Sequence, residues 1–211
     1  MSDNAWVKDF VERLTSVEGN FEIFASLFLK YEQQFVFGLK DSKEWVEEFG
    51  ERKAFFTAIG GRIEEGADII QFLKNHALQD IGVNINIIDS PYTYLDYQHR
   101  LKKIPINLVK GEIRPQIITI IQKARYAATP NTLIFSYAAT TKSKPDSSQY
   151  SALFLVKESV LVQMFKNKKA VQELKKAGAS FEERIKIPDN LYLIPTGSIN
   201  SLLRFLSYEV F

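Results

Sequence analysis

The chain has 211 residues, of which 45% are hydrophobic and 25% are charged, and it contains no cysteine. This composition supplies enough apolar surface for one substantial core, so we predict a single domain over residues 1–211 rather than a disordered chain. The lack of cysteine excludes disulfides, a thiol nucleophile and a thiolate metal centre.

The charge is distributed unevenly along the chain. Residues 1–80 carry 9 basic and 15 acidic side chains, whereas residues 81–211 carry 18 basic and 10 acidic ones. The excess is greatest over residues 100–186, with 17 basic and 6 acidic side chains. Such a concentration of positive charge predicts a polyanion as a partner.

The N-terminal residues are polar and lack a basic segment followed by an apolar one. No apolar run in the sequence reaches the roughly 18 residues that cross a bilayer. We therefore expect a cytoplasmic protein that does not engage a membrane.

The first half of the chain is dominated by helical spacing of apolar residues. Residues 1–33 predict a helical N-terminal region of two helices, in which Phe21, Phe24 and Phe28 lie on one face of the second. A strand is predicted at residues 34–39, and a helix at about residues 41–59.

Gly60 and Gly61 follow that helix and favour its end, with another helix at residues 62–78. An alternative makes residues 54–59 a strand, so that Gly60, Gly61 and Arg62 form an anion-binding turn at the start of the next helix. The pair of glycines matches neither of the common glycine-rich phosphate-binding motifs, which favours the first interpretation.

From residue 82 onward, strands and helices are predicted to alternate. Ser90 as N-cap and Pro91 at the first helical position indicate a helix entry. The polar segment 138–150 indicates an exposed loop. The predicted strands are residues 83–88, 131–137, 151–156 and 190–194, and the predicted helices are residues 91–101, 112–126, 157–177 and 199–206.

This alternation predicts an α/β fold with a Rossmann-like, mostly parallel sheet of about four to five strands flanked by helices, formed by residues 34–211. In such sheets the ligand crevice lies beyond the carboxyl ends of the strands. The candidate crevice residues are Asp89, Ser90, Thr140, Thr141, Thr196 and Ser198.

The predicted helix at residues 157–177 places its lysines on one arc beside its apolar face, which predicts a basic stripe. Tyrosines interleaved with basic residues add surfaces on which bases could stack. An ordinary solvated face, or a face that docks on the acidic N-terminal half or on a partner protein, explains the charge equally well. The candidate nucleic-acid-binding residues are Arg100, Lys102, Lys103, Arg114, Lys142, Lys144, Lys157, Lys168, Lys169, Lys175 and Lys176.

Catalytic motifs are absent from the sequence. His76 and His99 are the only histidines and lack metal-ligand spacing, so we expect no metal and no cofactor. Asp89 alone is a candidate catalytic residue, because it follows a predicted strand. It supports an alternative function as a metal-dependent nuclease or nucleotide-processing hydrolase that uses residues of the 138–150 loop.

The favoured hypothesis is a non-catalytic protein that binds nucleic acid or another anionic partner through its basic C-terminal region, as a component of a larger assembly. A third hypothesis is a protein–protein interaction adaptor. Its docking face would be the aromatic N-terminal helices, with Trp6, Phe10, Phe21, Phe24 and Phe28.

Overall fold

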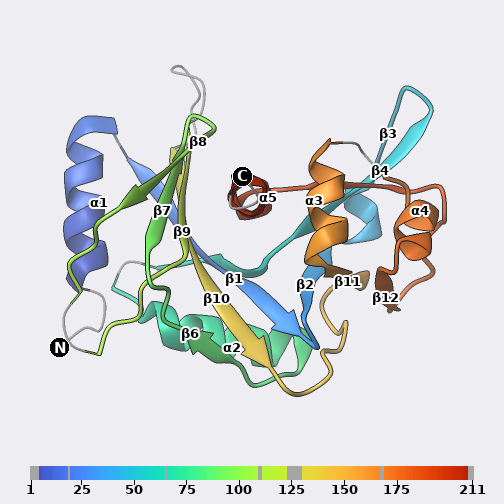
Figure 1. Cartoon of the computed structure of the whole chain (residues 1–211), viewed down its shortest axis with the longest axis horizontal. Coiled ribbons are helices and arrows are strands. Elements are labelled where there is room, and N and C mark those ends of the chain that lie inside the picture. Colours follow the sequence, from blue (N-terminus) through green and yellow to red (C-terminus); the bar gives the residue numbers. More distant parts are fainter. Residues whose placement is uncertain are drawn as a thin grey trace.

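The computed structural model describes residues 5–18, 20–64, 66–108, 111–122, 130–166 and 169–208. In this part of the chain, thirteen strands join in one mixed sheet with helices on both faces (Figure 1). The helices are α1 Ala5–Glu18, α2 Ile69–Ile81, α3 Glu158–Lys166, α4 Val171–Lys176 and α5 Ser198–Tyr208, with a 3-10 turn at Ser42–Glu44. The strands are β1 Phe21–Tyr31, β2 Gln34–Leu39, β3 Val46–Glu48, β4 Glu51–Thr57, β5 Ile59–Arg62, β6 Asn86–Ile88, β7 Thr93–Tyr97, β8 Arg100–Ile104, β9 Ile117–Ile121, β10 Asn131–Thr141, β11 Ala152–Lys157, β12 Ser180–Glu183 and β13 Tyr192–Pro195.

Two long parallel strands, β1 and β10, form the centre of the sheet, and each has 11 residues. The outer edge of each strand is shared by two neighbours. β1 pairs with β5 along its first half and with β2 near its end. β10 pairs with β9 along its first half and with β6 near its end. The sheet therefore divides on both sides of the central pair, and this division opens a cleft.

The two faces of the sheet carry separate cores, because successive side chains of a strand point to opposite faces. Leu27 and Leu29 of β1 belong to the core beneath α1 and α2, whereas Phe28 belongs to the core beneath α3 and α5. Both faces of β1 are thus buried. Its sequence is consequently almost continuously apolar, as is typical of central strands covered on both sides.

The Rossmann-like prediction is wrong, because most strand pairs among the described residues are antiparallel. The parallel pairs are β1–β10, β4–β13 and β7–β9. Hairpins rather than helices connect several neighbouring strands, such as β1–β2, β3–β4 and β7–β8. Two strands that are joined by a short turn must run antiparallel, because a parallel pair needs a long crossover connection. The short turns therefore make this sheet mostly antiparallel.

Four predicted helices are strands or hairpins in the structure. The second N-terminal helix is β1, and the helix at residues 41–59 is the 3-10 turn followed by β3 and β4. Residues 91–101 form most of the β7–β8 hairpin. The helix at residues 112–126 is replaced by β9, and residues 123–129 lie outside the described residues.

Gly60 and Gly61 lie inside β5 and do not end a helix or form an anion-binding turn. The following helix α2 begins later than predicted, with Asp68 as its N-cap accepting a hydrogen bond from the backbone N–H of Gln71. The predicted strands near residues 131–137, 151–156 and 190–194 are confirmed, as is the last helix. None of the described helices is long and apolar enough to cross a membrane.

Candidate functional site

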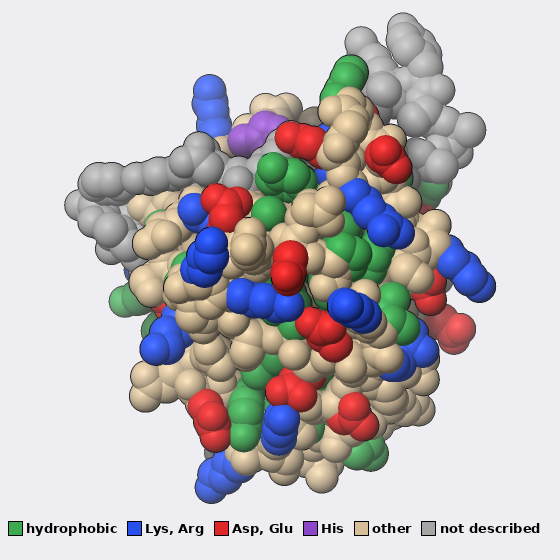
Figure 2. Space-filling model, turned by 90° about the vertical axis from the view of Figure 1, so that its right-hand side faces the viewer, with side chains coloured by type: hydrophobic (Ala, Val, Ile, Leu, Met, Phe, Trp, Pro, Cys, Tyr) green, Lys and Arg blue, Asp and Glu red, His purple; other side chains and the backbone are tan. Residues whose placement is uncertain are grey.

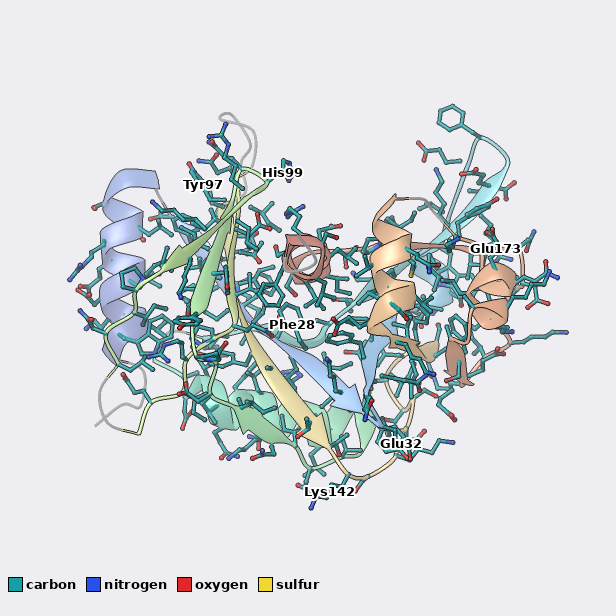
Figure 3. All side chains as sticks on the ribbon, in the orientation of Figure 1. Phe28, Glu32, Tyr97, His99, Lys142 and Glu173 are labelled. Carbon is teal, nitrogen blue, oxygen red and sulfur yellow. The ribbon has the colours of Figure 1, made fainter. Side chains whose placement is uncertain are left out.

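A cleft of about 390 Å³ opens where the sheet divides, between the central strands and α5. Its volume lies within the range of small-molecule sites. Phe28 of β1 lies beneath α5 at the centre of the molecule (Figure 3). The side chains that line the cleft include residues of β1, β2, β7, β10 and α5. These elements are far apart in the sequence and meet only in the folded protein.

The register of β1 and β10 builds the floor of this cleft. Phe28 lies opposite Ala138, and Lys30 lies opposite Thr140, so these four side chains share one face of the sheet. The small side chain of Ala138 leaves space above it. The floor is therefore hollow and apolar at its centre and polar at the end where Lys30 and Thr140 meet.

Aromatic rings form the walls of the cleft. Phe35 and Tyr94 lie on opposite sides, and Phe205 of α5 meets Tyr94 edge to face with 5.0 Å between ring centroids. Tyr92 stands at the mouth with 51% of its surface exposed and has the ammonium of Lys103 over its ring. Such walls suit a flat, apolar ligand group, because rings stack on one another favourably.

One ion pair lies at the mouth of the cleft. Lys30 Nζ donates a hydrogen bond to Glu158 Oε2 at 3.2 Å, and the same ammonium lies 4.4 Å from the centroid of the Phe35 ring. Glu158 is the first residue of α3, directly after β11. Both side chains remain partly exposed, at 39% and 49%, so a ligand can reach them.

Beneath α5, buried polar side chains join the helix to the sheet. Ser26 Oγ lies 2.9 Å from Ser136 Oγ and 3.0 Å from Ser198 Oγ. Thr119 Oγ1 donates to Ser201 Oγ at 2.8 Å. Because buried hydrogen-bonding groups need defined partners, these contacts fix the position of α5 over the cleft.

Two of the predicted crevice residues do meet in this cleft. Ser90 and Thr140 line it, although they are 50 positions apart in the sequence. Asp89 does not point into it: its Oδ1 accepts a hydrogen bond from the backbone N–H of Arg114 at 2.7 Å. Asp89 therefore positions a loop, and the structure gives no support to a catalytic role for it.

The other three predicted crevice residues serve local structure. Thr141 Oγ1 hydrogen-bonds within its own loop, to the backbone of Ser143. Thr196 Oγ1 donates to the carbonyl of Phe56 at 2.9 Å. Ser198 belongs to the serine contacts beneath α5. The strand ends therefore do not gather at one edge, since the strands run in both directions.

The predicted basic stripe does not form. The helix at residues 157–177 is two separate helices, α3 and α4, and Lys168 lies outside the described residues. Figure 2 shows basic and acidic side chains interspersed on the face that carries α3, α4 and β12. Lys175 pairs with Glu183 at 3.4 Å and with Asp189 at 3.1 Å.

The remaining basic candidates are scattered over different elements. Lys144 pairs with Glu182 at 2.9 Å, and this hydrogen bond raises the pKa of the Lys144 ammonium. Arg114 Nη1 donates to the backbone carbonyl of Ser90. Arg100, Lys102 and Lys103 lie on β8, Lys142 lies in the loop after β10, Lys157 ends β11, and Lys169 and Lys176 flank or end α4. The hypothesis of a non-catalytic protein that binds nucleic acid through a basic C-terminal surface is therefore wrong.

The aromatic N-terminal residues pack on the sheet to different extents. Trp6 is 7% exposed, and its ring meets Phe135 edge to face with 5.5 Å between centroids. Phe10 packs on the same ring at 6.2 Å. Phe28 is 2% exposed. Trp6 and Phe28 are thus buried against the protein's own sheet, whereas Phe10, Phe21 and Phe24 are half-buried, and a protein partner at this region stays a prediction.

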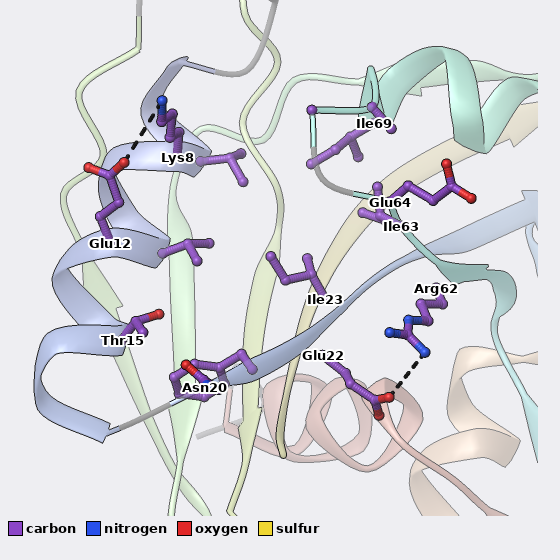
Figure 4. Close-up of a pocket in the computed structure, with 15 residues that line it drawn as sticks. Lys8, Glu12, Thr15, Asn20, Glu22, Ile23, Arg62, Ile63, Glu64 and Ile69 are labelled. Atoms are coloured by element: carbon purple, nitrogen blue, oxygen red, sulfur yellow. Dashed lines mark ion pairs between the residues drawn. The ribbon is translucent and has the colours of Figure 1, made fainter. Parts of the chain in front are cut away.

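A second, larger groove of about 720 Å³ lies between α1, β1 and the segment that joins β5 to α2 (Figure 4). Four of its charged side chains pair along the rim, Lys8 with Glu12 at 3.9 Å and Arg62 with Glu22 at 3.2 Å. They do not converge on a common point in the groove. We therefore place the candidate site in the central cleft.

The sequence analysis missed two pairs of side chains that could take part in chemistry. Lys30 and Glu158 are 128 positions apart, and no local pattern connects them. His76 and Asp80 share a hydrogen bond of 3.0 Å between Nδ1 and Oδ2 on α2, and their four-residue spacing on a helix was a detectable signal. Among the described residues, no group of three acidic or histidine side chains could hold a metal ion.

Comparison with known proteins gives similarity to solved structures only. No protein-family model matches the chain, and no curated protein matches it. The solution structure of the E. coli ORF135 protein is similar with a TM-score of 0.44 and 8% identity, over 68% of this chain and 79% of that one. A hydrolase of the NUDIX family from Clostridium perfringens has a TM-score of 0.43 and 16% identity, over 67% and 84%.

A UDP-X diphosphatase is also similar, with a TM-score of 0.43 and 8% identity, over 97% of this chain and 71% of that one. The names of these last two structures describe hydrolytic enzymes. We draw no conclusion about the activity of this chain from similarity at this level. The argument for its function therefore depends on the cleft itself.

Proposed function

We propose that the chain is a hydrolase that acts on a nucleotide, or on a related phosphate compound with a flat ring, bound in the central cleft. The observation that carries this proposal is the Lys30–Glu158 pair at the mouth of an aromatic-lined cleft. The aromatic walls and the charged pair each suit a different part of the same ligand.

The ring of the ligand would lie between Phe28, Phe35 and Tyr94, where it gains stacking contacts and loses water. The phosphate would lie at the polar end of the floor, where Lys30 and the hydroxyl of Thr140 supply donors. A phosphate attracts the Lys30 ammonium and competes with Glu158 for it.

Glu158, once released from Lys30, is the general base of the proposed reaction. Its carboxylate accepts a proton from a water molecule as the water oxygen forms a bond to phosphorus. The bond from phosphorus to the leaving oxygen breaks, and the proton passes from Glu158 to that oxygen. Lys30 balances the negative charge that develops on the phosphate oxygens.

The described residues do not provide a dedicated metal cage, so no step of this reaction is assigned to a metal ion. Magnesium often enters such sites on the substrate phosphates and takes only one or two carboxylates from the protein. Glu158 is the carboxylate at this cleft that could serve in that way, and the assay below includes both conditions.

The test is a hydrolysis assay with a panel of nucleoside mono-, di- and triphosphates and nucleoside diphosphate sugars, with and without magnesium. Glu158→Gln keeps the shape of the side chain and removes the base. We expect it to lower kcat by about 10²–10⁴ while KM changes little. Lys30→Met should raise KM for the same substrate.

Glu12→Gln is the matched control, because Glu12 is an exposed carboxylate on α1 that pairs with Lys8 away from the cleft. It should leave both kinetic constants unchanged. Wild-type protein that hydrolyses no member of the panel would refute the proposal. So would a Glu158→Gln variant as active as the wild type.

A further inference from the structure

The groove of Figure 4 lies beside a strand edge that has no neighbour. β5 pairs with β1 from Leu27 back to Phe24. Among the described residues, the last hydrogen bond on this side runs from the backbone N–H of Ile63 to the carbonyl of Ile23, at 2.8 Å. Beyond this bond the chain leaves the sheet towards α2, and no described strand continues beside Phe21. The beginning of β1 therefore has an open edge.

The backbone of Phe21 directs this open edge towards the groove. The carbonyl of Asn20 accepts a hydrogen bond from Asn131 of β10, whereas the carbonyl of Ile23 accepts one from the opposite side. Because the backbone groups of successive strand residues point to alternate sides, the N–H and C=O of Phe21 point the same way as those of Ile23, away from β10. Residues 20–23 all line the groove. The groove thus offers one donor and one acceptor that no described strand uses.

The side chains beside the open edge differ between the two faces of the sheet. On one face, Ile23 lies between α1 and the segment that carries Ile63 and Ile69, and this side of the groove is apolar (Figure 4). On the other face, Glu22 pairs with Arg62 at 3.2 Å. Since strand side chains alternate between faces, a strand added here places one residue against the apolar side and the next against this charged pair.

The rim of the groove carries more negative than positive charge. Its two cations each lie within 4 Å of a carboxylate, and Glu64 has no ion-pair partner among the described residues. The first 80 residues as a whole carry 9 basic and 15 acidic side chains. Opposite charges directly across two strands stabilise the pair, and like charges destabilise it. The residue across from Glu22 is therefore expected to be basic. The charged residues that line the groove are Lys8, Glu12, Glu22, Arg62 and Glu64.

We propose that this groove binds an extended peptide segment of a partner protein, which adds to β1 as an antiparallel strand in line with β5. A large apolar residue of the peptide lies opposite Phe21 and exchanges both backbone hydrogen bonds with it. Its side chain enters the apolar side of the groove, because residues directly opposite each other share a face. A basic residue beside it lies opposite Glu22. In such strand addition the main chain supplies affinity and alternate side chains supply specificity. This site is independent of the hydrolase proposed above.

The first experiment is a fluorescence-anisotropy titration of the full chain against labelled, end-capped pentapeptides Ser-Lys-X-Lys-Ser, where X is Leu, Ile, Val or Phe. We expect at least one dissociation constant on the order of 100 µM or lower. Methylation of the backbone nitrogen of X removes the donor for the carbonyl of Phe21 and should raise the dissociation constant about tenfold or more. Replacement of both lysines by glutamates should also weaken binding.

A charge exchange tests the residue across from the basic side chain. Glu22→Lys should bind the glutamate peptide more tightly than the lysine peptide, which reverses the preference of the wild type. Asp9→Lys is the matched control, because Asp9 is an exposed carboxylate on α1 that pairs with Arg13 at 2.9 Å and does not line the groove. It should keep the wild-type preference. A Glu22→Lys variant that still prefers the lysine peptide contradicts the proposed register.

Amide hydrogen exchange, followed residue by residue by NMR, measures the open edge directly. A saturating peptide should slow exchange of the Phe21 N–H about tenfold or more, because this group gains a hydrogen bond. Three results overturn the proposal. They are the lack of binding by every peptide of the panel up to about 1 mM, equal binding of the methylated and unmethylated peptides, and binding that leaves the exchange of Phe21 unchanged. The second of these identifies adsorption by charge alone.

Discussion

Arg204→Met tests whether the buried ion pair beneath α5 holds this helix to the sheet. Asp96 of β7 is 2% exposed, and both Nε and Nη2 of Arg204 donate to its Oδ2, the former at 2.9 Å. The other oxygen, Oδ1, has no hydrogen-bond partner among the described residues. Methionine retains the apolar stem of the arginine but leaves the Asp96 carboxylate buried without its counter-charge.

Loss of one partner from a buried pair costs about 3–5 kcal/mol. Because 20% of the Arg204 side chain is exposed, water can approach the vacated space, and we expect a loss of about 3 kcal/mol, at the lower end of that range. Asp96→Val combined with Arg204→Met removes both charges. Since replacing a buried pair by apolar side chains is often neutral, the double variant should recover most of the loss.

Urea unfolding at neutral pH measures these free energies, provided that the slope with urea is unchanged. Arg13→Met is a suitable control, because its pair with Asp9 lies on the exposed surface of α1. It should change the stability little. A loss below about 1 kcal/mol for Arg204→Met, or a double variant less stable than the single one, would refute the reasoning.

Three further variants or conditions test the packing of the sheet. Gly60→Ala should lose about 3 kcal/mol or more in thermal unfolding, because φ is +143° and the added Cβ would lie 2.1 Å from the carbonyl oxygen of Ala25; a loss below about 1 kcal/mol would contradict this. Gly38→Ala should cost about 1–3 kcal/mol, because its Cβ would lie 2.2 Å from the ring of Tyr150, and Tyr150→Ala should cancel the clash in the double variant. Burial raises the pKa of Tyr137 and of Tyr150, so the part of the unfolding free energy that these phenols contribute below pH about 10 should be lost as the pH rises further. Rapid ionisation of both phenols in the folded protein, measured by ultraviolet absorbance, would contradict this prediction.

The sequence predicts the elements whose surroundings match their local pattern. α5 and the start of β10 are examples, since the first has a helical apolar face and the second a run of β-branched and aromatic residues. β1 is the opposite case, because Phe21, Phe24 and Phe28 also fit a helical period. Burial of both faces removed the alternation that would have marked it as a strand.

The β7–β8 hairpin shows a second limit of local patterns. Ser90 and Pro91 indicated a helix entry, but pairing with β9 determines the structure of residues 93–97. The turn itself uses Gln98 and His99 with positive φ, where glycine or asparagine would have signalled a hairpin. The pairing partner is more than 20 residues away, so no local pattern could reveal it.

The candidate site was predictable only where it coincides with strand or loop ends. Ser90 and Thr140 were placed in a crevice and do line the cleft. Lys30 and Glu158 were not considered, because each resembles an ordinary surface residue beside its own element. Their pairing depends on the register that places β11 beside β2, and β2 beside β1.

The same helix that carries Arg204 also shapes the cleft, which links the stability of α5 to ligand binding. Ser198, Ser201 and Arg204 recur at three-residue spacing and contact the sheet. Leu202 and Phe205 occupy a neighbouring arc of α5 and line the cleft. A rotation or shift of α5 that relieves the unpaired Asp96 in Arg204→Met must therefore displace the Phe205 ring from Tyr94. We expect this variant to weaken binding of the ring portion of a ligand, raising KM, while the Lys30–Glu158 pair on other elements keeps kcat close to that of the wild type. Equal KM values for the two proteins would show that the polar contacts stabilise α5 without setting the shape of the cleft.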